Sequence, residues 1–411
     1  MIQLFLQDSN RTMSPLCLKK ETEGALPSFT GGGTMMLYRR IPGDNRDLSI
    51  LGFGCMRLPL TEEGTIHESL AEEMLFSAID GGINYVDTAW PYHNGASEPF
   101  VGKALEGEYR KKVFLATKLP LWEIEAPQDM EKILEQQLQR LRTDHIDFYL
   151  LHNFNEQRWE HMKKMGFEKF LQKAQEQNII RKVGFSFHDQ LPLFKTIVDS
   201  YPWDFCQIQY NYLDRNYQAG TEGLLYAASK KLGVIVMEPL RGGKIVQNVP
   251  PAIQEIWNRA AIPRSPAEWG LRWLWNIPEI TLVLSGMSTP EQVRENLEIA
   301  SRGLPESLEK EELELVDAAA REYTQRMIYP CTSCGYCLPC PQGVRIPECL
   351  NHYNSAFMFD DLPRARFTYR AMLDVENRAS ACINCGACLP KCPQHISIPQ
   401  ALAKVRELLE E

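Results

Sequence analysis

The chain has 411 residues, of which 44% are hydrophobic and 24% are charged, and this is enough for one large core and a smaller second domain. Its formal net charge of -9 argues against nucleic acid or an anionic membrane as a partner. No apolar stretch approaches the roughly 20 residues that a membrane-spanning helix requires, so no membrane-spanning segment is expected.

The first 36 residues lack the pattern of a folded element. Met1–Leu6 is a short apolar run without the basic residues and the longer apolar stretch of a secretory signal, so we expect a cytoplasmic protein. Gly31–Gly33 predicts a flexible joint. We therefore expect residues 1–36 to form a disordered N-terminal extension, or to result from an upstream translation start, and to carry no chemistry.

Apolar, strand-like runs alternate with amphipathic, helix-like stretches between residues 37 and 303. The strand-like runs are Leu48–Cys55, Ile83–Asp87, Val113–Lys118, Ile146–His152, Lys182–Phe187, Phe205–Tyr210, Val234–Glu238 and Ile280–Ser285. The helix-like stretches include Ile66–Asp80, Gln128–Leu141, Phe167–Asn178, Gly220–Lys231, Pro266–Trp275 and Pro290–Ala300. Strands that are apolar throughout are typical of a parallel sheet covered on its faces. Eight such units in about 250 residues predict an α/β fold, one (β/α)8 TIM barrel.

Polar side chains stand at the ends of three successive strand-like runs. The second run ends at Asp87 and is followed by Tyr92, the third ends at Lys118, and the fourth ends at His152. Any one of these has an ordinary structural explanation, such as a helix cap or a satisfied core histidine. Because a (β/α)8 barrel carries its catalytic groups at the carboxyl ends of its strands, the four together predict an active site.

These four residue types fit the reduction of a carbonyl group by hydride. The reaction creates an alkoxide, which needs a proton in the transition state. Tyr92 can supply that proton if its pKa is lowered, and a nearby Lys118 ammonium lowers it by stabilising the tyrosinate. Asp87 would hold the ammonium charged and in place, and His152 would donate to the carbonyl oxygen and orient it.

Four local motifs resemble the tetrad region of the aldo-keto reductase superfamily. They are Asp87-Thr88-Ala89 with Tyr92, Ala116-Thr117-Lys118, Leu150-Leu151-His152, and Glu98 with Val101-Gly102-Lys103-Ala104-Leu105. The resemblance covers residues 37–303. It implies an NAD(P)H-dependent oxidoreductase that interconverts a small-molecule carbonyl and an alcohol, with Tyr92 as the acid/base.

The same resemblance implies where NADP or NAD would bind. Gly54 would lie beside the nicotinamide, and Ser186 and Gln207 would bond its carboxamide. Residues 237–244 would cover the pyrophosphate, and the helix that starts at residue 290 would offer its N-terminus to a phosphate. The implied cofactor-binding residues are Gly54, Ser186, Gln207, Met237, Pro239, Leu240, Gly242, Lys244, Gly286, Ser288, Gln292 and Asn296.

The sequence departs from the family pattern at this cofactor site. Phe187 stands where an Asn usually follows the carboxamide-binding serine, and Met237 stands where an aromatic ring stacks on the nicotinamide. The Lys and Arg that clamp the 2′-phosphate of NADP in many members fall on Gly286 and Gln292. NADP and NAD therefore remain alternatives, and Arg294, a candidate replacement cation, is expected on the solvent face.

Residues 331–411 contain one cysteine motif twice. The first run is Cys331, Cys334, Cys337 and Cys340, and the second is Cys382, Cys385, Cys388 and Cys392. The second run has the bacterial ferredoxin spacing C-x2-C-x2-C-x3-C-P, in which the fourth cysteine serves the other cluster. We therefore expect two 4Fe-4S clusters, one on Cys331, Cys334, Cys337 and Cys392, and one on Cys340, Cys382, Cys385 and Cys388.

Two other uses of these cysteines fit less well. Tetrathiolate zinc sites pair two C-x-x-C units across a longer gap. Disulfides need an oxidising compartment, and the sequence shows no signal for export to one. A ninth thiol nearby, Cys349, is expected to be buried rather than to bind iron.

The C-terminal part is expected to be mainly α-helical. Ser307–Tyr323 predicts a helix inside a connecting segment, residues 304–330. Helical spacing over Pro347–Phe359 and Pro363–Leu373 then predicts a helical, ferredoxin-like dicluster domain over residues 331–411. The whole architecture resembles the subgroup of aldo-keto reductases that carries a C-terminal ferredoxin-type domain.

Hydride transfer needs no iron, so the clusters require their own explanation. We expect them to pass single electrons to or from the barrel or a partner such as a ferredoxin or flavoprotein. One alternative is an electron-transfer or docking module on a barrel with little carbonyl turnover. Another is a purely structural role for the clusters in a domain too small to be stable alone. The sequence leaves open the substrate, the reaction direction and the oligomeric state.

Overall fold

The computed structural model describes residues 35–333 and 335–411. The predicted N-terminal extension therefore lies outside the described residues, except for Met35, which is exposed, and Met36, which is buried. All described residues belong to one compact unit.

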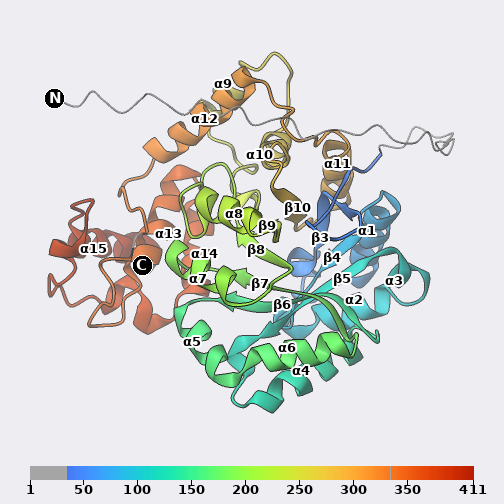
Figure 1. The fold of residues 1–411 in the computed structure, drawn as a ribbon. Coiled ribbons are helices and arrows are strands. Elements are labelled where there is room, and N and C mark those ends of the chain that lie inside the picture. Colours follow the sequence, from blue (N-terminus) through green and yellow to red (C-terminus); the bar gives the residue numbers. More distant parts are fainter. Residues whose placement is uncertain (1–34, 334) are drawn as a thin grey trace, which may run out of the picture. The chain divides into compact units, whose positions relative to one another are not determined.

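Eight parallel strands close into a barrel (Figure 1). They are β3 (Leu51–Gly54), β4 (Tyr85–Asp87), β5 (Phe114–Pro120), β6 (Ile146–Phe154), β7 (Ile180–Phe187), β8 (Phe205–Gln209), β9 (Gly233–Met237) and β10 (Ile280–Ser285). They are neighbours in chain order, and β10 pairs with β3 to close the ring, with Val283 opposite Leu51. The predicted (β/α)8 TIM barrel is confirmed.

The first predicted strand, Leu48–Cys55, was wrong as a single element. Its first two residues form β2 (Leu48–Ser49), which pairs antiparallel with β1 (Tyr38–Arg39) outside the barrel. Both pieces are buried, so hydrophobicity alone does not reveal the break between them.

The β1–β2 hairpin closes one end of the barrel. Ile41 and Leu48 join the cluster of side chains that fills the barrel interior, together with Phe148 and Phe205. Arg39 donates from Nη1 to the carbonyls of residues at the start of β10, including Ile280 at 2.6 Å. A filled interior and one closed end leave the carboxyl ends of the strands as the open face.

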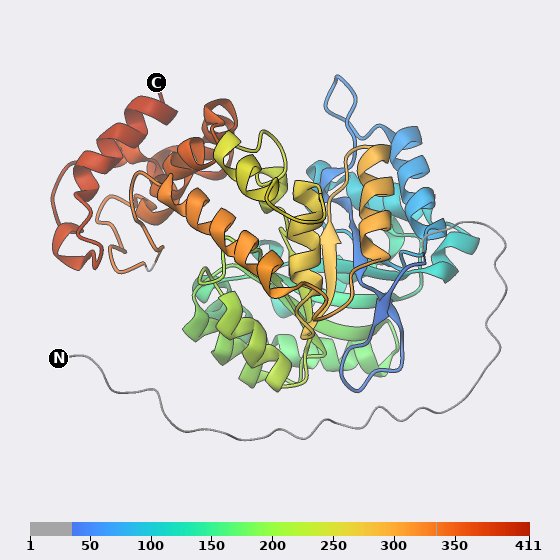
Figure 2. The same ribbon diagram turned by 90° about the horizontal axis from the view of Figure 1, so that it is seen from above.

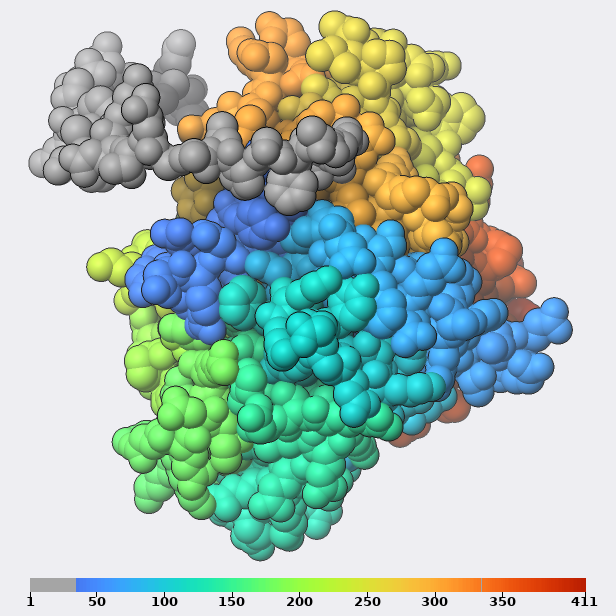
Figure 3. Space-filling view, turned by 90° about the vertical axis from the view of Figure 1, so that its right-hand side faces the viewer, coloured from blue at the N-terminus to red at the C-terminus, as the bar shows by residue number. Residues whose placement is uncertain are grey.

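Helices surround the barrel (Figure 2). They are α1 (Glu68–Asp80), α2 (Ser97–Ala104), α3 (Glu108–Lys112), α4 (Pro127–Arg140), α5 (Glu156–Met165), α6 (Phe167–Glu176), α7 (Leu191–Ser200), α8 (Gly220–Ser229), α9 (Pro251–Trp257), α10 (Pro266–Trp275) and α11 (Pro290–Ala300). The last two begin as their sequence predicts, with Pro at the first helical position after Ser265 and Thr289 caps. The side of the barrel seen in Figure 3 is built mainly by the first half of the described chain.

The C-terminal part is helical, as predicted. It contains α12 (Lys310–Gln325), α13 (Ile346–Met358), α14 (Leu362–Met372) and α15 (Ile398–Leu409). Val316, Ala319 and Tyr323 of α12 are buried in the same core as the barrel helices, whereas α13, α14 and α15 share a second core around Cys349 and Leu402. None of the helices in the described ranges is long and apolar enough to cross a membrane.

Candidate active site and cysteine-lined cavities

A buried ion pair lies at the carboxyl end of the barrel. Lys118 Nζ donates to Asp87 Oδ1 at 2.6 Å and to the Thr88 carbonyl at 2.7 Å. Asp87 lies opposite Ala116 in the strand register, and Lys118, two residues further along β5, points to the same side. Burial opposes the charge on Lys118, but Asp87 and Tyr92 outweigh it and raise the Lys118 pKa, so the ammonium stays protonated.

Tyr92 completes this cluster from the short helix η2 (Tyr92–Gly95). Its Oη accepts a hydrogen bond from Lys118 Nζ at 3.3 Å. Burial raises the pKa of Tyr92 above its ordinary value, although Lys118 acts in the opposite direction. Lys118 lowers the Tyr92 pKa, as the sequence leads us to expect, but desolvation of the tyrosinate is the larger effect. The hydroxyl is therefore held protonated at neutral pH, which is the form that donates a proton.

His152 faces Tyr92 from β6. The two ring centroids are 6.2 Å apart at an interplanar angle of 82°. Burial, followed by the charges of Lys118, His188 and Arg158, holds the pKa of His152 well below its ordinary value, so the imidazole is neutral. Its Nδ1 is buried without a hydrogen-bond partner among the described residues. A neutral imidazole carries one N–H that can donate to a carbonyl oxygen.

A second buried network holds the backbone of Lys118. Gln137 Nε2, on α4, donates to the Lys118 carbonyl at 3.0 Å and to Glu98 Oε1 at 2.7 Å. Glu98 also accepts from Thr117 Oγ1 at 2.7 Å, and Tyr149 Oη donates to Gln137 Oε1 at 2.7 Å. These side chains fix β5 against α2 and α4, and so position the lysine. Glu98 and Thr117 belong to motifs that the sequence singles out, but Gln137 and Tyr149 do not.

The expected carboxamide-binding residues lie side by side. Ser186 on β7 pairs in register with Gln207 on β8. Gln207 Nε2 donates to the Met237 sulfur at 3.5 Å, while its Oε1 is buried without a partner among the described residues. A buried amide oxygen without a partner is costly, and the NH2 group of a nicotinamide carboxamide would satisfy it. Ser186 and Gln207 therefore fit that cofactor.

The segment expected over the pyrophosphate contacts the C-terminal helices. Pro239 is buried and Leu240 half-buried at its start. Lys244 Nζ donates to Ser355 Oγ on α13 at 2.9 Å, and Arg364 on α14 donates to the Gly242 carbonyl. Gly242 has a φ of +66°, which favours glycine at that turn. The second domain thus contributes to the surroundings of the expected cofactor loop.

The expected cofactor-binding residues between β10 and α11 support one another. Asn296 Nδ2 donates to Ser285 Oγ at 3.0 Å, and the Ser288 backbone N–H donates to Gln292 Oε1 at 2.8 Å. These bonds fix the turn between β10 and α11. Arg294 is exposed and pairs with Glu291 at 2.7 Å, as expected for the solvent face.

Two further observations concern the nicotinamide end of the expected cofactor site. Phe187 is buried and packs against Phe194, so it offers no polar group to a ligand. Gly54, beside Asp87 in the register, would bring a Cβ to 3.3 Å from the Ser285 carbonyl oxygen. A side chain at residue 54 would therefore crowd the end of β10, beside the expected nicotinamide position.

Three side chains near His152 come from the segments that follow β5, β6 and β7. Trp122 lies 5.2 Å from the His152 ring, and the Arg158 guanidinium carbon lies 5.2 Å from the Trp122 ring. His188 follows β7 directly. All three follow predicted strand ends, which is where a (β/α)8 barrel builds its active site.

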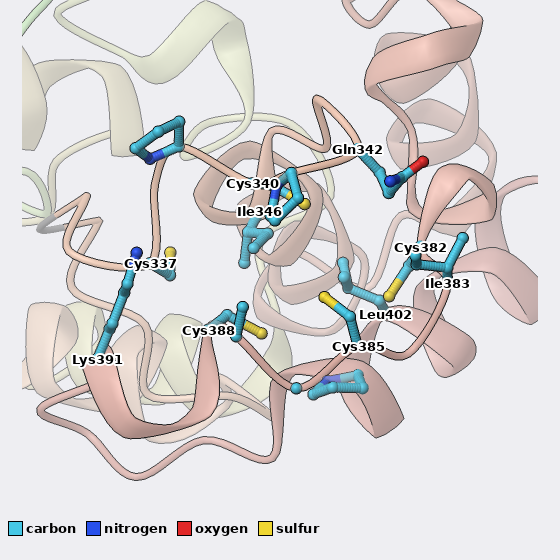
Figure 4. Close-up of a pocket in the computed structure, with 15 residues that line it drawn as sticks. Cys337, Cys340, Gln342, Ile346, Cys382, Ile383, Cys385, Cys388, Lys391 and Leu402 are labelled. Carbon is cyan, nitrogen blue, oxygen red and sulfur yellow. The ribbon is translucent and has the colours of Figure 1, made fainter.

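Two cavities in the C-terminal domain are lined by cysteines of both runs. The first is lined by Cys337 and Cys340 of the first run and by Cys382, Cys385 and Cys388 of the second (Figure 4). Soft thiolate sets of this kind suit iron–sulfur clusters. Cys349 lies apart, fully buried, and burial raises its thiol pKa to about 12.

The second cavity is lined by Cys331, Cys337 and Cys392. Cys334 lies outside the described residues. Each cavity thus combines three or more positions of one predicted cluster set, and the fourth cysteine of each run lies with the other run. No group of three His, Cys, Asp or Glu side chains within residues 35–333 and 335–411 is close enough to hold a single metal ion.

Comparison with known proteins matches both parts of the chain. Residues 50–320 match the aldo/keto reductase family, and residues 330–396 match the 4Fe-4S dicluster domain. The uncharacterized oxidoreductase YqkF of Bacillus subtilis is 26% identical over 72% of this chain and 98% of its own length.

Solved structures show the same barrel. The holo form of aldo-keto reductase AKR11C1 from Bacillus halodurans is 25% identical, with a TM-score of 0.58, over 69% of this chain and 96% of that chain. An aldo-keto reductase from Klebsiella pneumoniae, solved in complex with NADPH, is 22% identical, with a TM-score of 0.56, over 69% of this chain and 95% of its own.

Proposed function

This chain belongs to the aldo/keto reductase family and carries a 4Fe-4S domain, and on that premise we propose that it is an NAD(P)H-dependent oxidoreductase that interconverts a small-molecule carbonyl and an alcohol. One observation carries the proposal. The fully buried Lys118 Nζ lies 2.6 Å from Asp87 Oδ1 and 3.3 Å from Tyr92 Oη. The protonated Tyr92 hydroxyl, which is the proposed acid, is therefore hydrogen-bonded to the charged Lys118 ammonium.

Each of these residues has a defined task. Bound NADH or NADPH supplies the hydride. Tyr92 gives its hydroxyl proton to the carbonyl oxygen, and Lys118 stabilises the tyrosinate that remains. His152, held neutral, donates a hydrogen bond that orients the carbonyl. In the oxidation direction the same tyrosine takes the proton back.

We further propose that the two cysteine-lined cavities hold two 4Fe-4S clusters. The ligand sets are Cys331, Cys334, Cys337 and Cys392, and Cys340, Cys382, Cys385 and Cys388. Such clusters supply single-electron transfer, to or from the barrel or a ferredoxin or flavoprotein partner. Thiolates kept for iron rather than disulfides need a reducing compartment, so we infer a cytoplasmic location.

The experiment that tests this function is an anaerobic turnover screen of carbonyls and sugars with NADH and with NADPH. We expect at least one of NADH and NADPH to be oxidised in a reaction that depends on the added carbonyl or sugar. A parallel reaction contains protein whose clusters are chemically reduced and no nicotinamide. Turnover in that reaction shows that the clusters feed the barrel. If no carbonyl is reduced but the clusters exchange electrons with a carrier protein, the barrel is a docking module and the proposed reaction is wrong.

The environment of Lys244 predicts a pH dependence of cofactor binding. Burial, and then the charges of Arg241 and Arg364, lower the Lys244 pKa to about 8. An anionic pyrophosphate would stabilise the ammonium and raise that pKa again. Affinity should therefore be constant below about pH 8 and fall as the pH rises further, because only the free protein has lost the proton.

Titration of NADH binding by nicotinamide fluorescence between pH 7 and 9.5 measures this slope. Lys244→Met should bind more weakly and lose the slope. Superimposable pH profiles for the two proteins would show that Lys244 does not face the cofactor.

A further inference from the structure

Arg57 lies against Gly286 and Gly242, two glycines of the expected cofactor site. The family pattern leaves Gly286 and Gln292 at positions that often carry Lys and Arg, and Arg294 points to solvent in a pair with Glu291. Strand β3 ends at Gly54, and the short helix η1 (Cys55–Arg57) then carries Arg57 over the open end of the barrel.

Two glycines make room for the Arg57 side chain. A Cβ on Gly286 would lie 3.1–3.2 Å from the Arg57 Cβ, Cγ and Cδ atoms. A Cβ on Gly242 would lie 2.8 Å from Arg57 Nη2. The aliphatic part of the arginine therefore rests on the loop after β10, and its guanidinium reaches the loop after β9. The Arg57 carbonyl also accepts a hydrogen bond from Ser288 Oγ at 3.0 Å, which fixes its backbone to the same loop.

This position is the common phosphate site of the fold. In (β/α)8 barrels, phosphate groups bind between the loops after the seventh and eighth strands, beside a helix N-terminus. Here those strands are β9 and β10, and α11 follows them. Within the described residues, no hydrogen bond or ion pair holds the Arg57 guanidinium. A planar guanidinium with free N–H groups is well suited to two phosphate oxygens.

We propose that Arg57 binds the pyrophosphate of the nicotinamide cofactor. The inference rests on the proposed function and adds a binding residue to it. The pyrophosphate fits better than the 2′-phosphate because the guanidinium adjoins Gly242, in the segment expected over the pyrophosphate. At the expected 2′-phosphate position, the Gln292 side chain is engaged with the Ser288 backbone. Since NADH and NADPH share the pyrophosphate, Arg57 strengthens the binding of both.

The test measures binding to the full chain with its clusters loaded under anaerobic conditions. The probes are NADH, NADPH and ADP-ribose, which keeps the pyrophosphate but has no nicotinamide. Arg57→Gln should weaken all three by about 10- to 100-fold, the usual effect of a hydrogen bond to a charged group. Arg57→Lys should recover part of the loss, and the salt dependence of binding should be less steep in Arg57→Gln than in the wild type.

Arg294→Gln is the matched control, because it removes one exposed arginine beside the same helix. It should leave all three affinities unchanged, and thermal unfolding should show that both variants are folded. Equal affinities in wild type and Arg57→Gln would overturn the inference, and so would a loss confined to NADPH, which would assign Arg57 to the 2′-phosphate. Arg57-dependent binding of ADP-ribose without any carbonyl turnover would leave the inference intact and reject the proposed reaction.

Discussion

Replacing Tyr92 by Phe is expected to lower carbonyl turnover by about 10²-fold or more, the usual contribution of a general acid. The change removes the only atom of the side chain that can give a proton to the alkoxide. Lys118 is no substitute, because its ammonium is fully buried and already donates to Asp87 and Thr88. The proton source would then be water.

Cofactor binding should remain nearly intact in Tyr92→Phe, since the hydroxyl has no expected contact with the nucleotide. The separation of kcat from the affinity for NADH or NADPH therefore tests the role of the residue. Tyr85→Phe is the matched control. Tyr85 lies on the same strand as Asp87, and its hydroxyl is buried without a hydrogen-bond partner among the described residues. Its loss should leave turnover unchanged.

Near-normal turnover in Tyr92→Phe would remove this residue from the mechanism. Equal losses in the two variants would instead indicate a general effect of hydroxyl removal on the barrel. Steady-state rates with a substrate from the turnover screen, and fluorescence titration with NADH, are sufficient to decide.

The four tetrad positions could be predicted from the sequence because each is local. Asp87, Lys118 and His152 each terminate a continuous apolar run, and such runs predict buried strands of a barrel whose geometry brings their ends together. The direction of the Tyr92 pKa could not be predicted in this way. It depends on how deeply the ring is buried, which is a property of the folded site and not of the spacing.

Contacts between distant loops were outside the reach of the sequence. The sequence names Gly242 and Gly286 as expected cofactor-binding residues but not Arg57, which meets both from a third segment, and no periodicity relates the three. The same holds for Gln137, whose amide supports the Lys118 backbone from a neighbouring helix. The break after Ser49 was missed for another reason, since β2 and β3 are both buried along their whole length.

The cysteine motifs could be predicted in part from the sequence. Their spacing predicts cluster ligands and, through the Pro after the fourth cysteine, an exchange of ligands between the runs. The structure brings Cys392 to the cavity that Cys331 and Cys337 line, and Cys340 to the cavity of the second run. The spacing alone left Cys340 less certain, because the first run has one residue fewer before its fourth cysteine.

Wild-type protein purified without oxygen is expected to contain about eight irons and eight sulfides, as two cubane clusters require. Cys349→Ser is the reference substitution, because this thiol is buried away from both cavities and its pKa of about 12 keeps it protonated. It should leave the iron content unchanged. Bound zinc with little iron in the wild type would reject the cluster assignment altogether.

Cys392→Ser is expected to alter the paramagnetic resonance signal of the cluster that also depends on Cys331, and to spare the signal that depends on Cys385. The physical reason is that the chain turns at Pro393, so the Cys392 sulfur serves the cavity of the first run. Spectra of reduced Cys331→Ser and Cys385→Ser proteins identify the two signals. If Cys392→Ser instead changes only the signal that Cys385→Ser abolishes, each run binds its own cluster.

Exchange of ligands would also link residues 331–340 to residues 382–392. Loss of either cluster should then loosen the whole C-terminal domain, because metal binding and folding are coupled, while the barrel remains folded.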